Sequence, residues 1–222
     1  MKGPRPTLER EIALWQAGGG LVAGLDEAGR GPLAGPVVAA AVVFPAHCRP
    51  IRGLRDSKLL PAAKRERLAR LVWVRALAVS VGAASVREID HLNIRQASIL
   101  AMRRALARLA VRPAHVLIDG LPAPELGCPH QAIVDGDVHC HSIAAASVVA
   151  KTLRDRLMVL LARRYPGYAW TTNKGYGTPE HLAALAAFGF TVHHRKSFAP
   201  VVQLELAAWG RTPGPPALAA PP

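Results

Sequence analysis

The sequence has few cysteines and no long uninterrupted apolar run. Its three cysteines, Cys48, Cys128 and Cys140, cannot all pair and lack the spacing of a disulfide framework, which favours a reducing compartment. No apolar stretch is long enough to span a bilayer. The basic N-terminus is not followed by the apolar segment and cleavage site of a secretion signal. We therefore expect a cytoplasmic protein without a membrane-spanning segment.

Acidic residues are also scarce, because 15 Asp and Glu face 28 Lys and Arg, and the formal net charge is +13. So basic a chain suits a polyanionic partner, either nucleic acid or a charged membrane surface. The glycine-rich stretches match neither G-x-x-x-x-G-K-[ST] nor G-x-G-x-x-G, which argues against nucleotide binding of those two kinds. The chain has no internal repeats, and its 222 residues, half of them hydrophobic, suffice for one core. Nucleic acid is the favoured partner, bound by a monomer.

Strand-like and helix-like segments alternate after an opening pair of strands. Apolar runs rich in Val, Ile and Ala predict five strands, at residues 21–25, 36–44, 78–86, 116–119 and 132–134. Helical spacing of apolar residues predicts six helices, at residues 8–17, 61–74, 89–110, 142–164, 179–188 and 200–209. The Gly/Pro-rich turn between the first two strands favours an antiparallel pair. We expect an α/β fold with a mixed sheet of about five strands flanked by helices, and a small helical C-terminal region.

The chain divides into three parts by composition. Residues 1–20 form an N-terminal extension with a short helix, and residues 21–198 form one domain that includes the helical C-terminal part. Residues 199–222 comprise a terminal helix and a Pro- and Ala-rich tail, which we expect to be disordered from Arg211 onward.

Three aspartates follow or end strand-like runs. Asp26 comes directly after residues 21–25, Asp119 ends V-L-I-D, and Asp137 follows the short run at residues 132–134. Strand ends in an open α/β sheet meet at a shared crevice, so we expect these carboxylates to lie together. Clustered carboxylates repel one another unless a cation is present, and hard oxygen ligands favour Mg²⁺ or Mn²⁺. With a basic surface, this predicts two-metal phosphoryl chemistry.

The adjacent pair Asp26 and Glu27 poses a geometric problem. Neighbouring residues of a regular strand point to opposite faces, so both acids reach one metal centre only if the chain leaves strand geometry there. The glycines that follow permit such a departure. The alternative is that one acid is an ordinary turn or surface residue, and in this glycine-rich setting we favour the first interpretation.

Six ordered sequence blocks resemble the bacterial ribonuclease HII family, the type 2 ribonucleases H, over roughly residues 8 to 200. The blocks are L-D-E-A-G-R-G-P-L-A-G-P at 25–36, D-S-K at 56–58, V-L-I-D-G at 116–120, G-D-x4-S-I-A-A-A-S-V-V-A-K at 136–151 with R-D-R-L-M at 154–158, N-K-G-Y-G-T-P-E-H at 173–181 and H-R-K-S-F at 194–198. The resemblance implies an RNase H-like fold and a metal-dependent endoribonuclease. Such an enzyme hydrolyses RNA in RNA–DNA hybrids and cuts on the 5′ side of ribonucleotides embedded in duplex DNA, leaving 5′-phosphate and 3′-hydroxyl ends.

The resemblance also assigns roles to individual residues. The family's metal-binding catalytic acids match Asp26, Glu27, Asp119 and Asp137. Its substrate-binding positions match the ribose-sensing loop Gly29, Arg30 and Gly31, the backbone contacts Ser57 and Lys58, and Tyr176, which packs on the deoxyribose beside the ribonucleotide. A glycine backbone can approach a sugar closely enough to hydrogen-bond its 2′-hydroxyl, which supports the loop's role independently.

The sequence departs from the family pattern near two of these positions. Asp135 adds a carboxylate beside Asp137, where the family often has Lys-Gly-Asp, and Asn173 replaces a frequent His before the Lys-Gly-Tyr element. Lys151 and Arg154 lie on the helix predicted at 142–164, and the sequence leaves open whether their side chains face the acids or solvent.

Other interpretations are less favoured. Cys128-Pro129-His130 and His139-Cys140-His141 carry zinc-ligand residue types, but their spacing fits no standard finger. A type 3 ribonuclease H would be expected to carry a further N-terminal domain before residue 21. A non-catalytic nucleic-acid-binding module would gain nothing from four acids facing phosphates.

Overall fold

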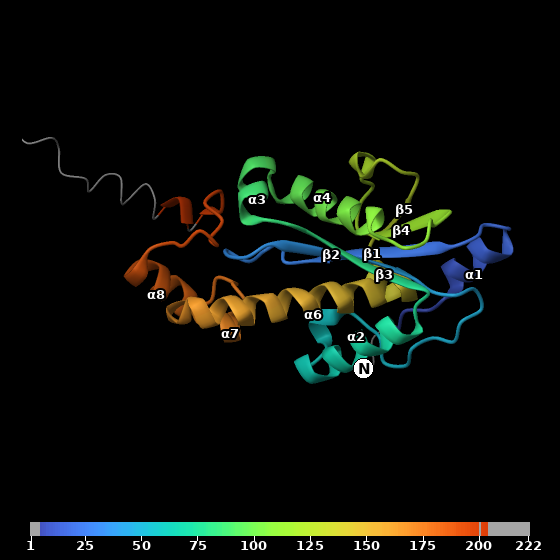
Figure 1. Cartoon of the computed structure of the whole chain (residues 1–222), viewed down its shortest axis with the longest axis horizontal. Coiled ribbons are helices and arrows are strands. Elements are labelled where there is room, and N and C mark those ends of the chain that lie inside the picture. The colour runs from blue at the N-terminus through green and yellow to red at the C-terminus, as the bar shows by residue number, and fades with distance from the viewer. Residues whose placement is uncertain (1–4, 200, 204–222) are drawn as a thin grey trace, which may run out of the picture.

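The computed structural model describes residues 5–199 and 201–203, in which a five-stranded mixed sheet lies between helices (Figure 1). The strands are β1 (Val22–Ala28), β2 (Val37–Val43), β3 (Ala78–Ala84), β4 (His115–Asp119) and β5 (Gln131–Ile133). Their order is β3-β2-β1-β4-β5; β2 is antiparallel to both of its neighbours, β3 and β1, whereas β1, β4 and β5 run parallel to one another. The predicted fold class and the opening antiparallel pair are confirmed.

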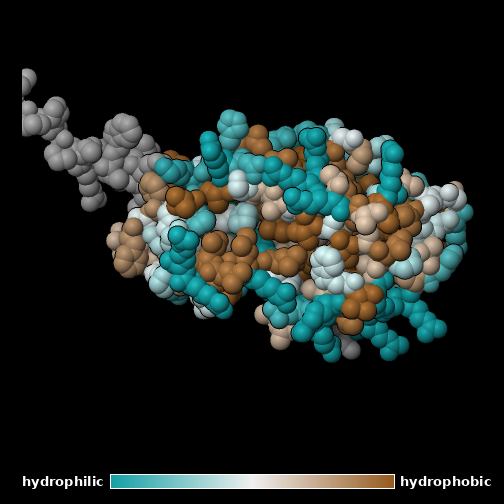
Figure 2. Space-filling model, in the orientation of Figure 1, coloured by the Kyte–Doolittle hydropathy of each residue, from teal (hydrophilic) through white to brown (hydrophobic). Residues whose placement is uncertain are grey.

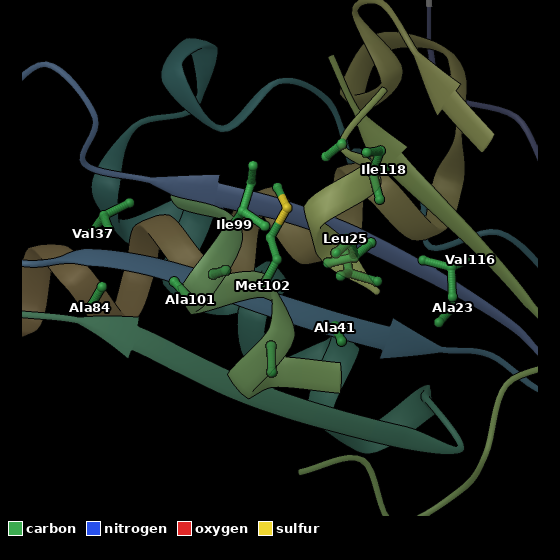
Figure 3. Packing of buried hydrophobic residues seen from close by; sticks show 14 of the residues in the cluster. Ala23, Leu25, Val37, Ala41, Ala84, Ile99, Ala101, Met102, Val116 and Ile118 are labelled. Carbon is green, nitrogen blue, oxygen red and sulfur yellow. The ribbon is translucent and has the colours of Figure 1, made fainter. Parts of the chain in front are cut away.

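Two long helices cover the two faces of the sheet (Figure 1). Helix α4 (Ile94–Ala107) packs on β3 and β2, and α6 (His141–Arg164) packs on β1 and β2 from the other side. On the α4 face, Leu25, Ile99, Met102 and Ile118 form part of a buried cluster (Figure 3). Strands buried on both faces read as continuous apolar runs, which explains the sequence V-V-A-A-A-V-V of β2.

The remaining helices are short or lie outside these two layers. They are α1 (Glu9–Gln16), α2 (Ala62–Arg75), α3 (Val86–Leu92), α5 (Gly136–His139), α7 (Trp170–Asn173) and α8 (Pro179–Phe188), with single 3₁₀ turns at Ser57–Leu59, Pro124–Leu126 and Pro166–Tyr168. Figure 2 shows hydrophilic side chains over α4 and around α2, the outward sides of helices whose other sides are buried. No helix in the described part of the chain is long and apolar enough to cross a membrane.

The helix predicted at residues 89–110 is two helices. Asn93 separates α3 from α4 with a φ of 73°, and its side chain caps α4 by accepting a hydrogen bond from the Gln96 N–H at 3.1 Å. Ser85 ends the preceding strand early because it forms a capping box with Glu88 at the start of α3. The prediction was wrong because the apolar spacing continues across the break, while the positive φ of a single Asn does not show in that spacing.

The N-terminal helix is tied to the core by a buried carboxylate. Glu11 of α1 accepts hydrogen bonds from the Ser142 backbone N–H at 2.8 Å and from its hydroxyl at 2.6 Å. The division into residues 1–20, 21–198 and 199–222 stays a prediction. The helix predicted at 200–209 lies outside the described residues except at 201–203, and the tail lies entirely outside them.

We expect Gly82→Ala to destabilise the protein. Gly82 lies on β3 under α4, where an added Cβ would overlap the helix backbone at Ala101 and Ala105. Overpacking against backbone atoms, which cannot rotate away, should lower the free energy of unfolding by about 1–3 kcal/mol. Chemical denaturation measures this. Ala83→Val, at the neighbouring exposed position, is the control and should change it little; equal effects of the two substitutions would contradict the packing argument.

Candidate active site

Four carboxylates come from three elements that end at the same edge of the sheet. Asp26 and Glu27 lie near the end of β1, Asp119 is the last residue of β4, and Asp137 lies in α5, which follows β5. Because β1, β4 and β5 run parallel, their carboxyl ends meet at one side of the sheet. The convergence predicted from strand ends is therefore present in the structure.

The chain does not leave strand geometry at Asp26 and Glu27, so that expectation was wrong. Strand β1 continues to Ala28, and both acids stay in register with β2, opposite Ala40 and Ala39. Asp26 faces Ser147 of α6, whereas Glu27 lies on the α4 side. Both acids can line one cavity because the pairing of β1 with β4 ends at Leu25, one residue before Asp26.

A cavity of about 320 Å³ brings together every residue that the sequence resemblance assigned to metal or substrate binding. It is lined by Asp26, Glu27, Asp119 and Asp137, by Gly29, Arg30 and Gly31, by Ser57 and Lys58, and by Tyr176, together with Ala28, Asp56, Asp135, Val138, Ser147 and Lys151. These residues come from segments up to 150 positions apart, from Asp26 to Tyr176. The roles of the individual residues remain proposals.

Burial and mutual repulsion raise the pKa values of the four acids. Burial and the charges of Glu27 and Asp119 hold the pKa of Asp26 well above its usual value. Burial, with the charges of Asp56 and Asp119, raises the pKa of Asp137 to about 6. The pKa values of Glu27 and Asp119 are also raised, mainly by burial, although Arg30 opposes this at Glu27.

The donor set of the cavity fits a hard divalent cation. Carboxylates that burial and repulsion destabilise are relieved when a cation lies between them, and oxygen donors favour Mg²⁺ or Mn²⁺ over softer metals. As their side chains stand, no three Asp, Glu, His or Cys residues in the described ranges form a ready-made coordination group.

The loop after β1 and the turn before α2 form two walls of the cavity. Gly29 has a φ of 97°, a conformation that favours glycine, and exposed Arg30 pairs with Glu27 at 3.2 Å. In the second wall, Asp56 accepts a hydrogen bond from the Lys58 N–H at 2.9 Å, and the Ser147 hydroxyl donates to the buried Ser57 hydroxyl at 3.0 Å. This fixes the turn and leaves the Lys58 side chain exposed.

Tyr176 stands on a turn built by Asn173. The buried Asn173 side chain donates to the Tyr168 carbonyl at 2.9 Å and accepts from the Gly175 N–H at 2.8 Å. Its departure from the family pattern is thus accommodated inside the fold, and Tyr176 remains 39% exposed at the cavity wall. The Lys151 ammonium lies 5.3 Å from the centre of the Tyr176 ring.

Sequence reasoning assigned no role to four polar residues that line the cavity, which are Asp56, Asp135, Ser147 and Lys151. Lys151 faces the cavity, whereas Arg154 faces neither the acids nor solvent and is fully buried. Asp56 belongs to the D-S-K block, and its charge raises the pKa of Asp137. Its carboxylate was the one sequence feature that could have placed it near the other acids. Asp135 and Ser147 also line the cavity; no sequence pattern orients Ser147 toward the acids.

Two histidines of the Cys/His segments, His130 and His141, already have hydrogen-bond partners. His130 Nε2 accepts from the Ala123 N–H at 3.0 Å, and His141 Nε2 accepts from the Ile51 N–H at 3.1 Å. Cys140 is buried, and burial raises the pKa of its thiol to about 12. These contacts support the structural interpretation of both segments.

A larger cavity, of about 460 Å³, lies between α2 and α6, lined partly by Arg65, Val159 and Leu160. Its one buried carboxylate, Asp155, is already paired with Arg65 at 2.7 Å and Lys151 at 2.8 Å. Size alone therefore does not identify the reactive site, and the chemistry of the lining favours the smaller cavity.

The fold and the acidic cavity define the class of a metal-dependent nuclease. The family model described as Ribonuclease HII matches residues 23–201. Ribonuclease HII of Synechococcus sp. (strain JA-3-3Ab) is 52% identical over 208 residues, covering 93% of this chain and 94% of that protein. Among solved structures, ribonuclease H2 of Pyrococcus horikoshii OT3 matches with a TM-score of 0.74 at 23% identity, covering 86% of this chain and all of the other. Bst-RNase HIII in complex with Mn²⁺ matches with a TM-score of 0.64 at 19% identity, covering 90% and 74%.

The chain belongs to the ribonuclease HII family. It is an endoribonuclease that requires a divalent metal and that cleaves RNA in RNA–DNA hybrids and at embedded ribonucleotides. The resemblance inferred from the six sequence blocks is thus confirmed.

We expect Asp137→Asn to stabilise the metal-free protein at pH 7. The folded pKa of Asp137, about 6, exceeds the usual 3.8, so the folded state binds the proton more tightly and loses stability as pH rises from about 4 to about 6. Because the carboxyl is half-buried and partly screened, removing its charge should recover on the order of 1 kcal/mol at pH 7 and nothing at pH 3.5. Thermal unfolding in a chelator at both pH values measures this.

The control is Glu66→Gln, which removes an exposed acid paired with Arg156 and should change stability little at either pH. Added Mg²⁺ or Mn²⁺ should raise the Tm of the wild type more than that of Asp137→Asn. A destabilised Asp137→Asn at pH 7 without metal would show that repulsion does not dominate at this position.

Proposed function

We propose that Asp26, Glu27, Asp119 and Asp137 hold Mg²⁺ or Mn²⁺ and that hydrolysis occurs in the 320 Å³ cavity, by two-metal-ion chemistry. The observation that carries this proposal is the convergence of four carboxylates with raised pKa values in one cavity of a protein with a net charge of +13. Bound cations would activate the attacking water and stabilise the leaving 3′-oxygen, which gives 5′-phosphate and 3′-hydroxyl ends.

The residues of the chain supply the metal ligands and position the substrate. Asp26 is 5% exposed and lies deepest, between β1 and α6, which suits a ligand shared by the ions. The exposed ammonium of Lys58 suits a phosphate oxygen of the nucleic-acid backbone, with Ser57 beside it. Lys58 also lowers the pKa values of Asp119 and Asp137, so it moderates the repulsion in the cavity.

Two parts of the cavity wall distinguish ribose from deoxyribose. The loop Gly29, Arg30 and Gly31 recognises the 2′-hydroxyl of the ribonucleotide through its backbone. Tyr176 packs its exposed ring on the neighbouring deoxyribose. In this arrangement the substrates are RNA–DNA hybrid and duplex DNA with embedded ribonucleotides, cut on the 5′ side of the ribonucleotide by a monomer in the cytoplasm.

Asp26→Asn should lower the rate of cleavage of a DNA duplex that contains one ribonucleotide by roughly 10³-fold or more. This loss corresponds to about 4 kcal/mol of transition-state stabilisation. The loss follows because an amide cannot supply the negative charge that holds the ions. Cleavage is followed on gels with Mg²⁺, Mn²⁺ or EDTA, beside an all-DNA duplex that should stay intact. Normal cutting by the variant would remove Asp26 from the site.

Tyr176→Ala should lower kcat/KM on the duplex with one embedded ribonucleotide by about 10-fold, the order expected for a lost stacking platform. The effect on a long RNA–DNA hybrid should be smaller, because that substrate has no deoxyribose next to the scissile ribonucleotide on the cleaved strand. Tyr176→Phe, which keeps the ring, is the matched control and should retain most activity on both substrates. Equal losses on both substrates would contradict the role of Tyr176 at the RNA-to-DNA step.

A further inference from the structure

Two arginines are fully buried without a carboxylate partner. Arg154 and Arg195 are both 0% exposed, and no Asp or Glu within the described residues lies within ion-pairing distance of either. Burial lowers the pKa of Arg195 to about 9, with a further contribution from the charge of Arg154. A desolvated cation is costly, so the hydrogen bonds that compensate it indicate what these side chains are for.

Arg195 gives its hydrogen bonds to the loop that lines the cavity. Its guanidinium donates to the carbonyls of Gly29 at 2.5 Å, Arg30 at 2.8 Å and Gly35 at 2.8 Å, and its Nε also donates to Gly35 at 3.0 Å. Its backbone N–H donates to the Leu33 carbonyl at 2.8 Å. Residues that are 160 or more positions apart in sequence are thereby fixed against each other.

Arg154 serves the neighbouring segment instead. It donates to the carbonyls of Pro36 at 3.0 Å, Lys174 at 3.0 Å and Ala34 at 2.9 Å, and to none of residues 29–31. The Arg154 side chain packs closely against Gly29, but among the described residues only Arg195 donates hydrogen bonds to the carbonyls of Gly29 and Arg30.

The carbonyl contacts of Arg195 also fix the direction of two backbone N–H groups in the loop. In a planar trans peptide, the N–H points opposite to the carbonyl of the preceding residue, and no cis peptide occurs in the described ranges. The Gly29 and Arg30 carbonyls point inward to Arg195, so the N–H groups of Arg30 and Gly31 point outward. Among the described residues, neither N–H donates a hydrogen bond, and both residues line the cavity.

We propose that Arg195 is a positioning residue for ribose recognition: by binding the Gly29 and Arg30 carbonyls, it presents the N–H groups of Arg30 and Gly31 as donors to the 2′-hydroxyl oxygen. This inference rests on the proposed role of the loop in sensing ribose. The guanidinium charge also polarises both peptide groups, which strengthens their N–H groups as donors.

An arginine is required at this position because the three carbonyls are spread out. Its planar fork reaches Gly35 from Nε, Arg30 from Nη1 and Gly29 from Nη2, whereas a lysine offers three donors on one atom. Arg195→Lys therefore keeps the charge but releases at least one carbonyl, and the peptide groups at Gly29 and Arg30 regain rotational freedom.

The first experiment compares Arg195→Lys with wild type on two duplexes of the same sequence. One carries a single ribonucleotide and gives kcat/KM; the other is all DNA and gives Ki as a competitive inhibitor. Arg195→Lys should lower kcat/KM by about 10-fold, the order expected for the loss of one or two hydrogen bonds, and change Ki less than about twofold. Unchanged kcat/KM, or equal changes in both constants, would overturn the proposal.

Arg154→Lys is the matched control, because Arg154 is equally buried and also binds three carbonyls. It should lower the Tm. The product of kcat/KM and Ki, in which an equal loss of binding to both duplexes cancels, should stay within about twofold of wild type. The same selective loss in Arg154→Lys would reduce the effect to general destabilisation and overturn the proposal. A wild-type protein that fails to cut the ribonucleotide duplex would instead refute the proposed function.

If Arg195→Lys does not fold, NMR tests without that substitution whether the N–H groups of Arg30 and Gly31 are the donors that the proposal requires. The backbone amide signals of Arg30 and Gly31 are followed in Asp26→Asn with Mg²⁺, which prevents cleavage. They should shift downfield with the ribonucleotide duplex and not with the all-DNA duplex. Equal responses to both duplexes would overturn the proposal, and cleavage during the titration would instead expose a failure of the Asp26 assignment.

Discussion

Repulsion among carboxylates at the carboxyl end of the sheet is the constraint on which the rest of the structure depends. Four acids with raised pKa values can stay together only on a rigid support. The sheet provides it, because Asp26 and Glu27 are held by pairing with β2, and Asp119 accepts a hydrogen bond from the Gly136 N–H at 2.6 Å. The acids therefore stay close without a cation. The folded state already contains their repulsion, so a bound cation is stabilised by relieving it.

Small residues allow this support to be compact. Gly24 lies against the backbone of α6 at Ser142, and Ala144, Ala145 and Ala146 are fully buried along that helix. Larger side chains would hold α6 farther from β1, because helix and strand backbones approach closely only across Gly or Ala. The approach of α6 brings Ser147 to Asp26 and Lys151 to Tyr176, so the alanine-rich sequence is part of the active-site geometry as well as of the core.

Sequence reasoning recovered the sheet, its opening antiparallel pair and the helices on either side, because strand and helix periodicities are local. It placed the acids together because they follow or end apolar runs. It failed at Asn93, where one positive φ divides a continuous helical pattern, and at Asp26 and Glu27, where β1 continues beyond its pairing with β4. The contacts of Arg195 were out of its reach, since they join residues 160 or more positions apart through backbone carbonyls, whose direction no residue type encodes.

The net charge of +13 comprises cations in two different physical environments. Exposed Lys58 and Arg30 keep their water and can exchange it for phosphate oxygens, so they suit a polyanion directly. Arg154 and Arg195 have lost their water and face backbone carbonyls, so they cannot reach a phosphate. A charge count treats both kinds alike. Only the first kind contributes to salt-dependent affinity, whereas the second holds peptide groups in place. In the proposed recognition of ribose, such fixed peptide groups and not charge supply the hydrogen-bond donors.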